Sequence, residues 1–293
     1  MKDFFSEDQA KEIWNQAAPS MSRERISDAY DSVNSFVVKS RRSTIIRHGS
    51  LFAAAIAICL SAGILIGRIH QDQAVIFAPT YAKYLSPNGQ VNDFQLSDGT
   101  HVYLNSGSRL TCAENFEGLA TRDVFLSGEA FFEVAKDCAH PFIVHAAGQS
   151  IKVTGTKFNV RSFLDEQNST VKLLEGGVEV EIPGQAGPIR LAPGQALSVS
   201  EDLSEISLYK IDPQNCVGWY KGEFNAYHMS LSQICKDLER KFNIKIMISN
   251  KNIAQKIFYA SFANNEDADM ILNALNVQHD FRVKKQDIFY TIY

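Results

Sequence analysis

Residues 50–67, SLFAAAIAICLSAGILIG, form a run of 18 residues without a charged side chain. A helix of this length rises roughly 27 Å, which is close to the hydrocarbon thickness of a bilayer. A buried core helix is the alternative, but charged side chains usually interrupt the helices of soluble proteins within such a length. We therefore expect residues 49–68 to form a single transmembrane helix, with 48 residues before it and 225 after it.

The charges on either side of this segment predict its orientation. Residues 34–48 carry four basic side chains and no acidic one, whereas residues 68–82 carry one of each. The positive-inside rule then places the N-terminus in the cytoplasm and exports the larger part. The whole chain has 29 basic and 33 acidic side chains, so it lacks the basic excess that is typical of nucleic-acid-binding proteins. We expect no direct contact with nucleic acid.

Residues 1–48 contain two short amphipathic patterns. A capping box at Ser6 precedes an apolar helical face that includes Ile13 and Trp14, and a second helical face includes Tyr30 and Phe36. So short a segment buries too little apolar surface to be stable alone. A solvated tail along the membrane is one interpretation. We favour a cytoplasmic helical module that completes its fold on a protein partner, with these four large side chains at the contact.

The exported part begins with a predicted linker at residues 69–85 and an all-β domain at residues 86–212. Asp98-Gly99 stands between alternating apolar residues and predicts a hairpin with a two-residue turn. Glycines separate the other apolar runs, so we expect a sandwich, a roll or a solenoid-like layer. Further strands are expected at residues 124–126, 130–134, 142–144, 151–153, 158–160, 171–174, 178–182, 189–191 and 197–199.

Residues 213–293 change to a mixed pattern of strands and helices. A strand at residues 220–227 leads to a helix capped by Ser230, and a strand at residues 257–262 leads to a second helix capped by Asn265. The expected apolar helix faces are Leu231, Ile234, Cys235 and Leu238, then Ala268, Ile271, Leu272 and Leu275. Strands at residues 244–248, 281–283 and 288–292 complete two βαβ units, which together predict a compact α+β domain.

Neither a nucleotide-binding loop nor a catalytic motif is present in the sequence, and we expect no enzyme activity, cofactor or metal. Cys138, His140 and His145 lie close together, but positions 140 and 145 point to opposite faces of an extended chain. Asp98 and Glu129 are candidate paired carboxylates. Structural roles in a turn and beside a glycine fit them better. In an oxidising compartment, Cys112 and Cys138 are the candidate pair for a disulfide.

Several stretches of the all-β region resemble one known family. They are LSDGTHVYLNSGSRL at residues 96–110, RDVFLSGEAFFEVAK at residues 122–136, HPFIVH at residues 140–145 and VTGTKFNV at residues 153–160. In this order they resemble the FecR family of transmembrane anti-sigma factors. The C-terminal domain is similar to the secretin/TonB short N-terminal domain. Residues 1–48 match the family only in size, helical character and tryptophan content.

This resemblance implies a signalling protein of the inner membrane. The cytoplasmic helices would hold an extracytoplasmic-function sigma factor through Ile13, Trp14, Tyr30 and Phe36. The exported part would sense the N-terminal signalling domain of a TonB-dependent outer-membrane transporter. Strand addition at the edge formed by residues 288–292 would make that contact, through Ile288, Phe289, Tyr290 and Ile292. The alternative is a membrane-anchored periplasmic glycan-binding protein or envelope scaffold.

Overall fold

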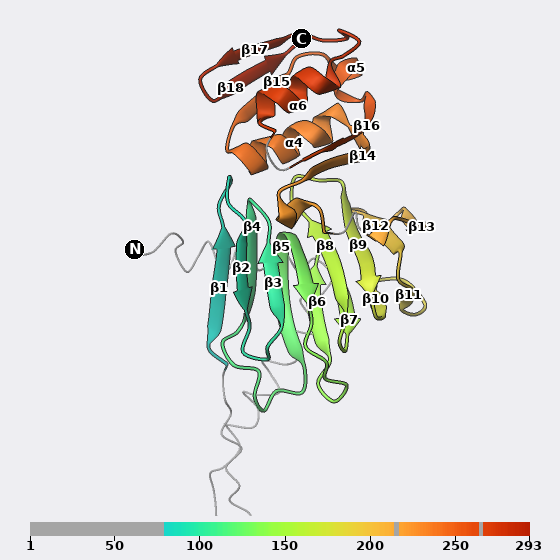
Figure 1. Cartoon of the computed structure of the whole chain (residues 1–293). Coiled ribbons are helices and arrows are strands. Elements are labelled where there is room, and N and C mark those ends of the chain that lie inside the picture. The colour runs from blue at the N-terminus through green and yellow to red at the C-terminus, as the bar shows by residue number, and fades with distance from the viewer. Residues whose placement is uncertain (1–78, 214–216, 264–265) are drawn as a thin grey trace, which may run out of the picture. The chain divides into compact units, whose positions relative to one another are not determined.

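The computed structural model describes residues 79–213, 217–263 and 266–293 (Figure 1). The predicted cytoplasmic helices with Ile13, Trp14, Tyr30 and Phe36 lie outside these residues, as does the predicted transmembrane segment. No helix in the described part of the chain is long and apolar enough to cross a membrane. The described residues fall within one compact unit and contain two separate hydrophobic cores. We call the two parts the β domain (residues 81–210) and the C-terminal module (residues 219–292).

The β domain consists of two sheets that pack face to face. Its strands are β1 (Tyr81–Ser86), β2 (Asn92–Gln95), β3 (His101–Leu104), β4 (Ser108–Ala113), β5 (Arg122–Glu133), β6 (Phe142–Ala146), β7 (Gln149–Val153), β8 (Lys157–Ser162), β9 (Asn168–Glu175), β10 (Val178–Glu181), β11 (Ile189–Leu191), β12 (Gln195–Ser200) and β13 (Ile206–Lys210). One sheet has the order β11-β10-β7-β6-β5-β4-β1 and the other β2-β3-β5-β8-β9-β12-β13. Only the β5–β6 pair is parallel among these strands. Strands predicted between residues 142 and 199 are confirmed.

Strand β5 belongs to both sheets. Its first half pairs with β4 and β6, and its second half pairs with β3 and β8. Gly128 lies at the change with a φ of +117°, and a Cβ atom there would come within 2.7 Å of the Ser108 Cα atom. The separate strands predicted at residues 124–126 and 130–134 are therefore one strand. The prediction was wrong because this glycine bends the backbone without ending the strand.

Alternating side chains of both sheets fill the core of the β domain. Val124 and Val144 come from one sheet, and Val102, Phe132 and Phe158 from the other; all five are fully buried. Apolar residues at every second position also mark the hairpin and most of the later strands in the sequence. The prediction of an all-β domain is confirmed.

Two details of the β domain differ from the prediction. The hairpin at Asp98-Gly99 exists as β2 and β3, with Gln95 opposite His101, so its loop has five residues and not two. The Asp98 carboxylate accepts hydrogen bonds from the backbone and the hydroxyl of Thr100, which stabilises this longer loop. Residues 81–86 form β1 and pair with β4, so the predicted linker at residues 69–85 is too long.

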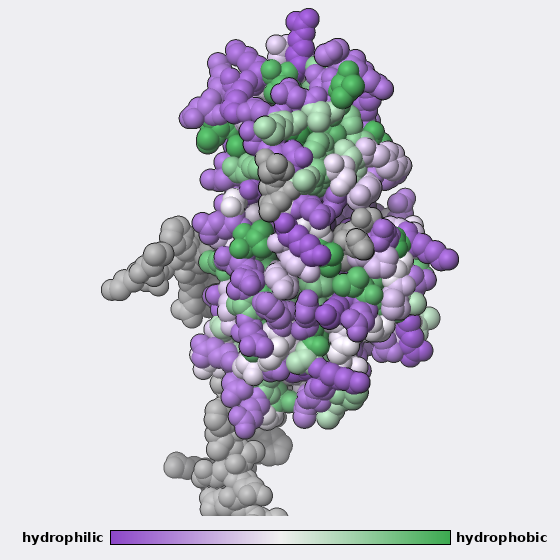
Figure 2. Space-filling model, viewed as in Figure 1, coloured by the Kyte–Doolittle hydropathy of each residue, from purple (hydrophilic) through white to green (hydrophobic). Residues whose placement is uncertain are grey.

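The C-terminal module contains three α-helices, one 3₁₀ helix and five strands among its described residues. Its elements are the 3₁₀ helix η2 (Trp219–Lys221), β14 (Phe224–Ser230), α4 (Leu231–Phe242), β15 (Lys245–Ile248), α5 (Lys251–Ala254), β16 (Ile257–Phe262), α6 (Ala268–Leu275), β17 (Val283–Gln286) and β18 (Phe289–Ile292). Apolar side chains of the α-helices and of the strands pack together in one hydrophobic core. On the face shown in Figure 2, hydrophobic residues form small patches between hydrophilic ones in both modules.

The two long helices largely follow the sequence. Ser230 caps α4 through a capping box with Gln233, as predicted. The predicted apolar faces of α4 and α6 are buried. The cap of α6 is Asp267, whose side chain accepts a hydrogen bond from the Met270 N–H group, and not Asn265. Residues 220–227 begin with η2, so the strand starts later than expected.

The strand pairing of this module differs from two βαβ units. Strand β14 pairs with β16 in an antiparallel sheet, and the second sheet has the order β15-β18-β17. The strands before and after α4 therefore lie in different sheets. Because β18 is central, with β15 on one side and β17 on the other, residues 288–292 offer no free edge for strand addition. That part of the prediction was wrong, because sequence periodicity does not specify which strands pair.

Candidate functional site

The residues considered for metal binding or catalysis have structural partners. His140 Nδ1 lies 2.8 Å from Asp137 Oδ2, and His145 Nε2 lies 2.7 Å from Asp123 Oδ1. No group of three or more histidine, cysteine or acidic side chains within the described ranges is placed to hold a metal ion. The structure does bring Ser150 Oγ to 3.2 Å from His145 Nδ1, a contact that the sequence did not suggest. Asp123, His145 and Ser150 lie on strands of one sheet, and Asp137 and His140 lie in the loop between β5 and β6. None of these five residues lines either of the two pockets at the junction of the described modules.

The predicted disulfide is absent. Cys112 and Cys138 are both free thiols in the structure. Cys112 is buried in β4, where burial raises the pKa of its thiol to about 11. Cys138 lies exposed in the loop between β5 and β6. A buried thiol in a core strand and an exposed thiol in a surface loop do not form a pair in this structure, so an oxidising compartment alone does not predict the pairing.

Asp98 and Glu129, the two carboxylates considered as a pair, each face a different arginine. Asp98 Oδ2 accepts a hydrogen bond from Arg122 Nη1 at 2.6 Å, and the Arg122 side chain is almost completely buried. Arg122 also donates to the backbone carbonyl of His140. This arrangement fixes the hairpin loop against the start of β5. Asp98 therefore has a structural role, as predicted.

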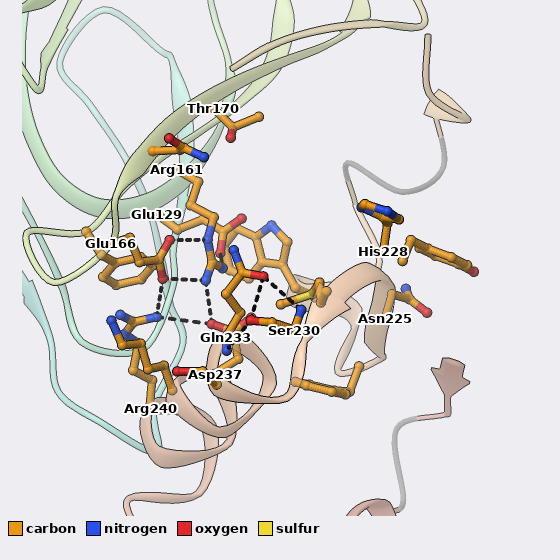
Figure 3. Close-up of a pocket in the computed structure, with 18 of the residues that line it drawn as sticks. Glu129, Arg161, Glu166, Thr170, Asn225, His228, Ser230, Gln233, Asp237 and Arg240 are labelled. Carbon is orange, nitrogen blue, oxygen red and sulfur yellow. Dashed lines mark hydrogen bonds and ion pairs between the residues drawn. The ribbon is translucent and has the colours of Figure 1, made fainter. Parts of the chain in front are cut away.

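Glu129 belongs to a larger group that joins the β domain to α4. We call Glu129, Arg161, Glu166, Asp237 and Arg240 the junction cluster (Figure 3). The first three lie on β5, on β8 and in the loop after β8, and the last two lie on α4. All five side chains are at most 18% exposed. Such burial is unusual for charged residues unless they are paired.

Arg161 is the centre of the junction cluster. Its Nη1 atom donates to Glu129 Oε2 at 3.0 Å, and its Nη2 atom donates to Glu166 Oε1 at 2.6 Å and to Asp237 Oδ1 at 2.5 Å. Its Nε atom donates to the second Glu166 oxygen at 2.8 Å. One guanidinium group thus binds carboxylates of both modules, in the bidentate geometry that arginine favours.

Arg240 repeats this arrangement from the other side. Its Nη1 atom donates to Glu166 Oε1 at 2.6 Å and to Asp237 at 3.1 Å, and its Nη2 atom donates to Asp165 Oδ1 at 2.6 Å. Its guanidinium carbon lies 3.6 Å from the centre of the Phe163 ring, a cation–π contact. The backbone N–H of Gly89 also donates to the Arg240 carbonyl at 2.7 Å. The end of α4 is therefore fixed to the β domain by charge and by backbone.

The charges of the junction cluster do not balance, since two arginines face three carboxylates. Burial raises the pKa of Asp237, Arg161 lowers it, and the neighbouring carboxylates of Glu166 and Glu129 raise it again, so that it lies above its ordinary value. Burial also opposes the charge of Glu129, but Arg161 and Lys172 outweigh it and the pKa of Glu129 is lowered. Asp237 is therefore the carboxylate of the cluster whose charged form is disfavoured, whereas the charged form of Glu129 is favoured.

An aromatic contact lies beside the junction cluster. Tyr220 of η2 stacks on Tyr103 of β3 at 4.2 Å and lies 5.3 Å from Phe131 of β5. Trp219 Nε1 donates to Asn159 Oδ1 at 2.9 Å, and Asn159 Nδ2 in turn donates to Glu129 Oε1 at 2.9 Å. The segment before β14 is thus linked to the same glutamate as α4. These rings cover one another and do not form an open aromatic platform of the kind that binds sugars.

A groove of about 1480 Å³ runs along this junction. Thr170 and Ser198, which lie opposite each other on β9 and β12, form part of one wall. Tyr227 and His228 of β14 form part of the other, and Gln233 of α4 lies close to Ser230 within it (Figure 3). The two modules are therefore separated by solvent-accessible space along part of their length.

Sequence analysis missed the junction cluster. Glu129 lies within a stretch that carried the family resemblance, but it was considered only as a candidate carboxylate beside a glycine. Arg161 directly follows another such stretch and was not singled out. Asp237 and Arg240 are three residues apart on the polar face of a helix, a spacing that usually marks a solvated ion pair. No periodicity in the sequence indicates that this face is covered.

Comparison with known proteins gives a consistent result. Residues 82–179 match the family model described as "FecR protein", and residues 223–292 match the model described as "FecR, C-terminal". Two crystal structures of a proposed anti-sigma factor from Parabacteroides distasonis are similar, each with 28% sequence identity and a TM-score of 0.68. They cover 73% and 72% of this chain, and 99% and 98% of their own. None of the curated proteins matches the chain.

Proposed function

The chain belongs to the FecR family, and we propose on this basis that it is an anti-sigma factor that holds a sigma factor until a signal arrives from outside the cytoplasm. The observation that carries this proposal is the order of the two family matches, the first of which lies within the β domain and the second within the C-terminal module. The similar P. distasonis chain is matched over almost its whole length and is itself described as a proposed anti-sigma factor. The family is regulatory and not enzymatic.

The proposed partner in the cytoplasm is an extracytoplasmic-function sigma factor. Residues 1–48 are the proposed binding module, with Ile13, Trp14, Tyr30 and Phe36 as its contacts. The apolar run at residues 50–67 and its basic N-terminal flank support a single crossing of the inner membrane, with the two described modules in the periplasm. In this arrangement the partner and the sensor are on opposite sides of the membrane, as a relay requires.

The proposed source of the signal is the N-terminal signalling domain of a TonB-dependent outer-membrane transporter. Of the four residues expected at this contact, Tyr290 and Ile292 are buried in the core, whereas Ile288 and Phe289 are exposed. Ile288 and Phe289 therefore remain the proposed contact residues. They would act through their side chains, because both edges of β18 are already paired.

Co-purification of the full-length chain with its sigma factor, from membranes, tests the proposal. We expect Trp14→Ala to reduce the amount of bound sigma factor strongly, because a large aromatic side chain at the centre of a contact contributes much of its affinity. Lys11→Ala, which lies outside the predicted apolar face, is the matched control and should bind like the wild type. If no sigma factor is retained by the wild type, or if Trp14→Ala binds equally well, the chain does not act as proposed.

A further inference from the structure

We propose that the C-terminal module is a detachable part of the exported region, held to the β domain by the junction cluster, and that its release is the step that carries the signal. This inference rests on the proposed function and adds the conformational change behind it. It concerns a rigid-body movement of residues 219–292 away from the β domain. Each module keeps its own fold during this movement.

The first argument is that the two modules do not share a core. The apolar residues of the β domain form one cluster, and those of the C-terminal module form another. Separation of the modules therefore leaves both clusters covered by their own module. The contacts that would be lost include the junction cluster, the backbone bond from Gly89 to Arg240 and the hydrogen bond from Trp219 to Asn159. The contact of Arg240 with Phe163 and those of Tyr220 with Tyr103 and Phe131 would be lost as well.

The second argument is the nature of those contacts. Burying ion pairs requires the removal of water from each charge, and this penalty offsets much of the attraction between the charges. Such contacts give a defined geometry but little net stability, in contrast to an apolar interface. When the modules separate, Arg161, Asp237 and Arg240 regain water, so the open form is not strongly disfavoured. A contact of this kind is suited to a reversible step.

The third argument is the charge imbalance. Two arginines serve three carboxylates in the junction cluster, so Asp237 shares its cations with Glu129 and Glu166. A partner that offers one further cation to Asp237, or one further anion to Arg240, competes directly with the docked arrangement. The groove of about 1480 Å³ along the junction gives such a partner access to this edge.

The position of Gly89 provides a direct way to test the inference. A Cβ atom on Gly89 would lie 3.5 Å from the Cβ atom of Asn243 at the end of α4. This separation lies within the range of Cβ–Cβ distances in disulfides. The pair Gly89→Cys and Asn243→Cys therefore locks the docked form when oxidised and frees it when reduced. Cys59, Cys138 and Cys216 are replaced by serine to prevent other pairing.

The first measurement is the rate of disulfide formation by this pair in the full-length chain in membranes. We expect Arg161→Gln to slow it, because the variant leaves three carboxylates facing one arginine. Breaking such a buried network should lower the docking equilibrium constant by roughly 100-fold. Arg282→Gln, an exposed arginine outside the junction, is the matched control and should not change the rate. Equal rates in all three proteins would overturn the inference without involving the sigma factor.

The second measurement is transcription that depends on the sigma factor. We expect the oxidised pair to hold transcription at the uninduced level in the presence of inducer, and reductant to restore the response. Arg161→Gln should raise transcription without inducer. When the oxidised cysteine pair is combined with Arg161→Gln, transcription should fall again. A variant with an unfolded β domain would not be rescued in this way. If the fully crosslinked protein responds to inducer like the wild type, the inference is overturned. If the wild type itself has no effect on transcription that depends on the sigma factor, the proposed function is overturned instead.

Discussion

Arg161 on β8 donates a hydrogen bond to Asp237 on α4 at 2.5 Å, although 76 residues separate them in the sequence. The same guanidinium group binds Glu129 and Glu166 of the β domain. One side chain therefore binds carboxylates of both the β domain and the C-terminal module. Substitutions in the junction cluster test how much these contacts contribute to stability. Replacing the carboxylates of Asp237 and Glu129 should have opposite effects.

Asp237→Asn should leave the protein at least as stable as the wild type at neutral pH. The pKa of Asp237 is raised, so the native protein holds a proton more tightly than the unfolded chain, and stability falls as the pH rises through the raised pKa. Asparagine keeps an oxygen acceptor for Arg161 and removes this penalty. Denaturant unfolding at neutral and mildly acidic pH checks the prediction, and the two proteins should converge in acid. A large loss of stability at neutral pH would contradict it.

Glu129→Gln should have the opposite effect. The pKa of Glu129 is lowered despite its burial, chiefly by Arg161, so its charge contributes stability that is present above its ordinary pKa and lost as the pH falls through the lowered one. Glutamine keeps one oxygen acceptor but replaces the other with an amide N–H group, which then faces donors of Arg161, Asn105 or Asn159. We expect a loss of about 3 kcal/mol at neutral pH. Denaturant unfolding followed by Trp219 fluorescence, in a Trp14→Phe background, measures it; a loss that does not shrink in acid would contradict the electrostatic cause.

Gly128→Ala should prevent β5 from joining both sheets. A Cβ atom there would lie 2.5 Å from the Cβ atom of Ser108, and the φ of +117° is itself unfavourable for alanine. Gly148→Ala is the control, because its φ of +74° is also positive but no atom lies within 4 Å of the added Cβ atom. We expect about 1 kcal/mol of destabilisation for the control and several times more for Gly128→Ala. Thermal unfolding distinguishes the two, and equal effects would contradict the role of close approach.

Cys138 should react with an alkylating agent in the native protein, whereas Cys112 and Cys235 should not. Burial raises the pKa of the Cys112 thiol to about 11 and that of Cys235 to about 12, so both are protonated and shielded. Cys138 is exposed. Mass spectrometry of peptides after alkylation, with and without denaturant, gives the pattern. A crosslinked peptide containing Cys112 and Cys138 under non-reducing conditions would contradict the structure.

Phe289→Ser should weaken binding of the transporter's signalling domain to the exported region. Phe289 is 58% exposed on β18, and the loss of a large apolar contact residue typically costs more than 1 kcal/mol of binding energy. Tyr259→Ser is the control, because Tyr259 is 70% exposed but lies on β16 of the other sheet. Calorimetric titration compares the two variants with the wild type. If only Tyr259→Ser weakens binding, the contact lies on the β14–β16 sheet instead.

The amino-acid sequence determined much of this protein by local rules. The alternation of apolar residues predicts the strands of the β domain, because successive side chains in a strand point to opposite faces. The capping box at Ser230 and the apolar face of α4 are equally local, since they depend on residues three and four apart. The failed predictions within single elements have different causes. Gly128 was interpreted as a strand end without knowledge of Ser108 opposite it, whereas the loop at Asp98 and the cap of α6 are set by contacts with Thr100 and Met270 two and three residues along the chain.

Tertiary structure alone decided which elements meet. Whether β18 is an edge or a central strand depends on pairing with β15, whose residues are more than 40 positions away, and no periodicity encodes that choice. The junction cluster is of the same kind, because Asp237 and Arg240 resemble a solvated pair until Arg161 is placed against them. The free energy of such contacts depends on burial and on geometry across the chain, which are properties of the folded molecule. The sequence therefore predicted the modules, and the fold decided how they are held together.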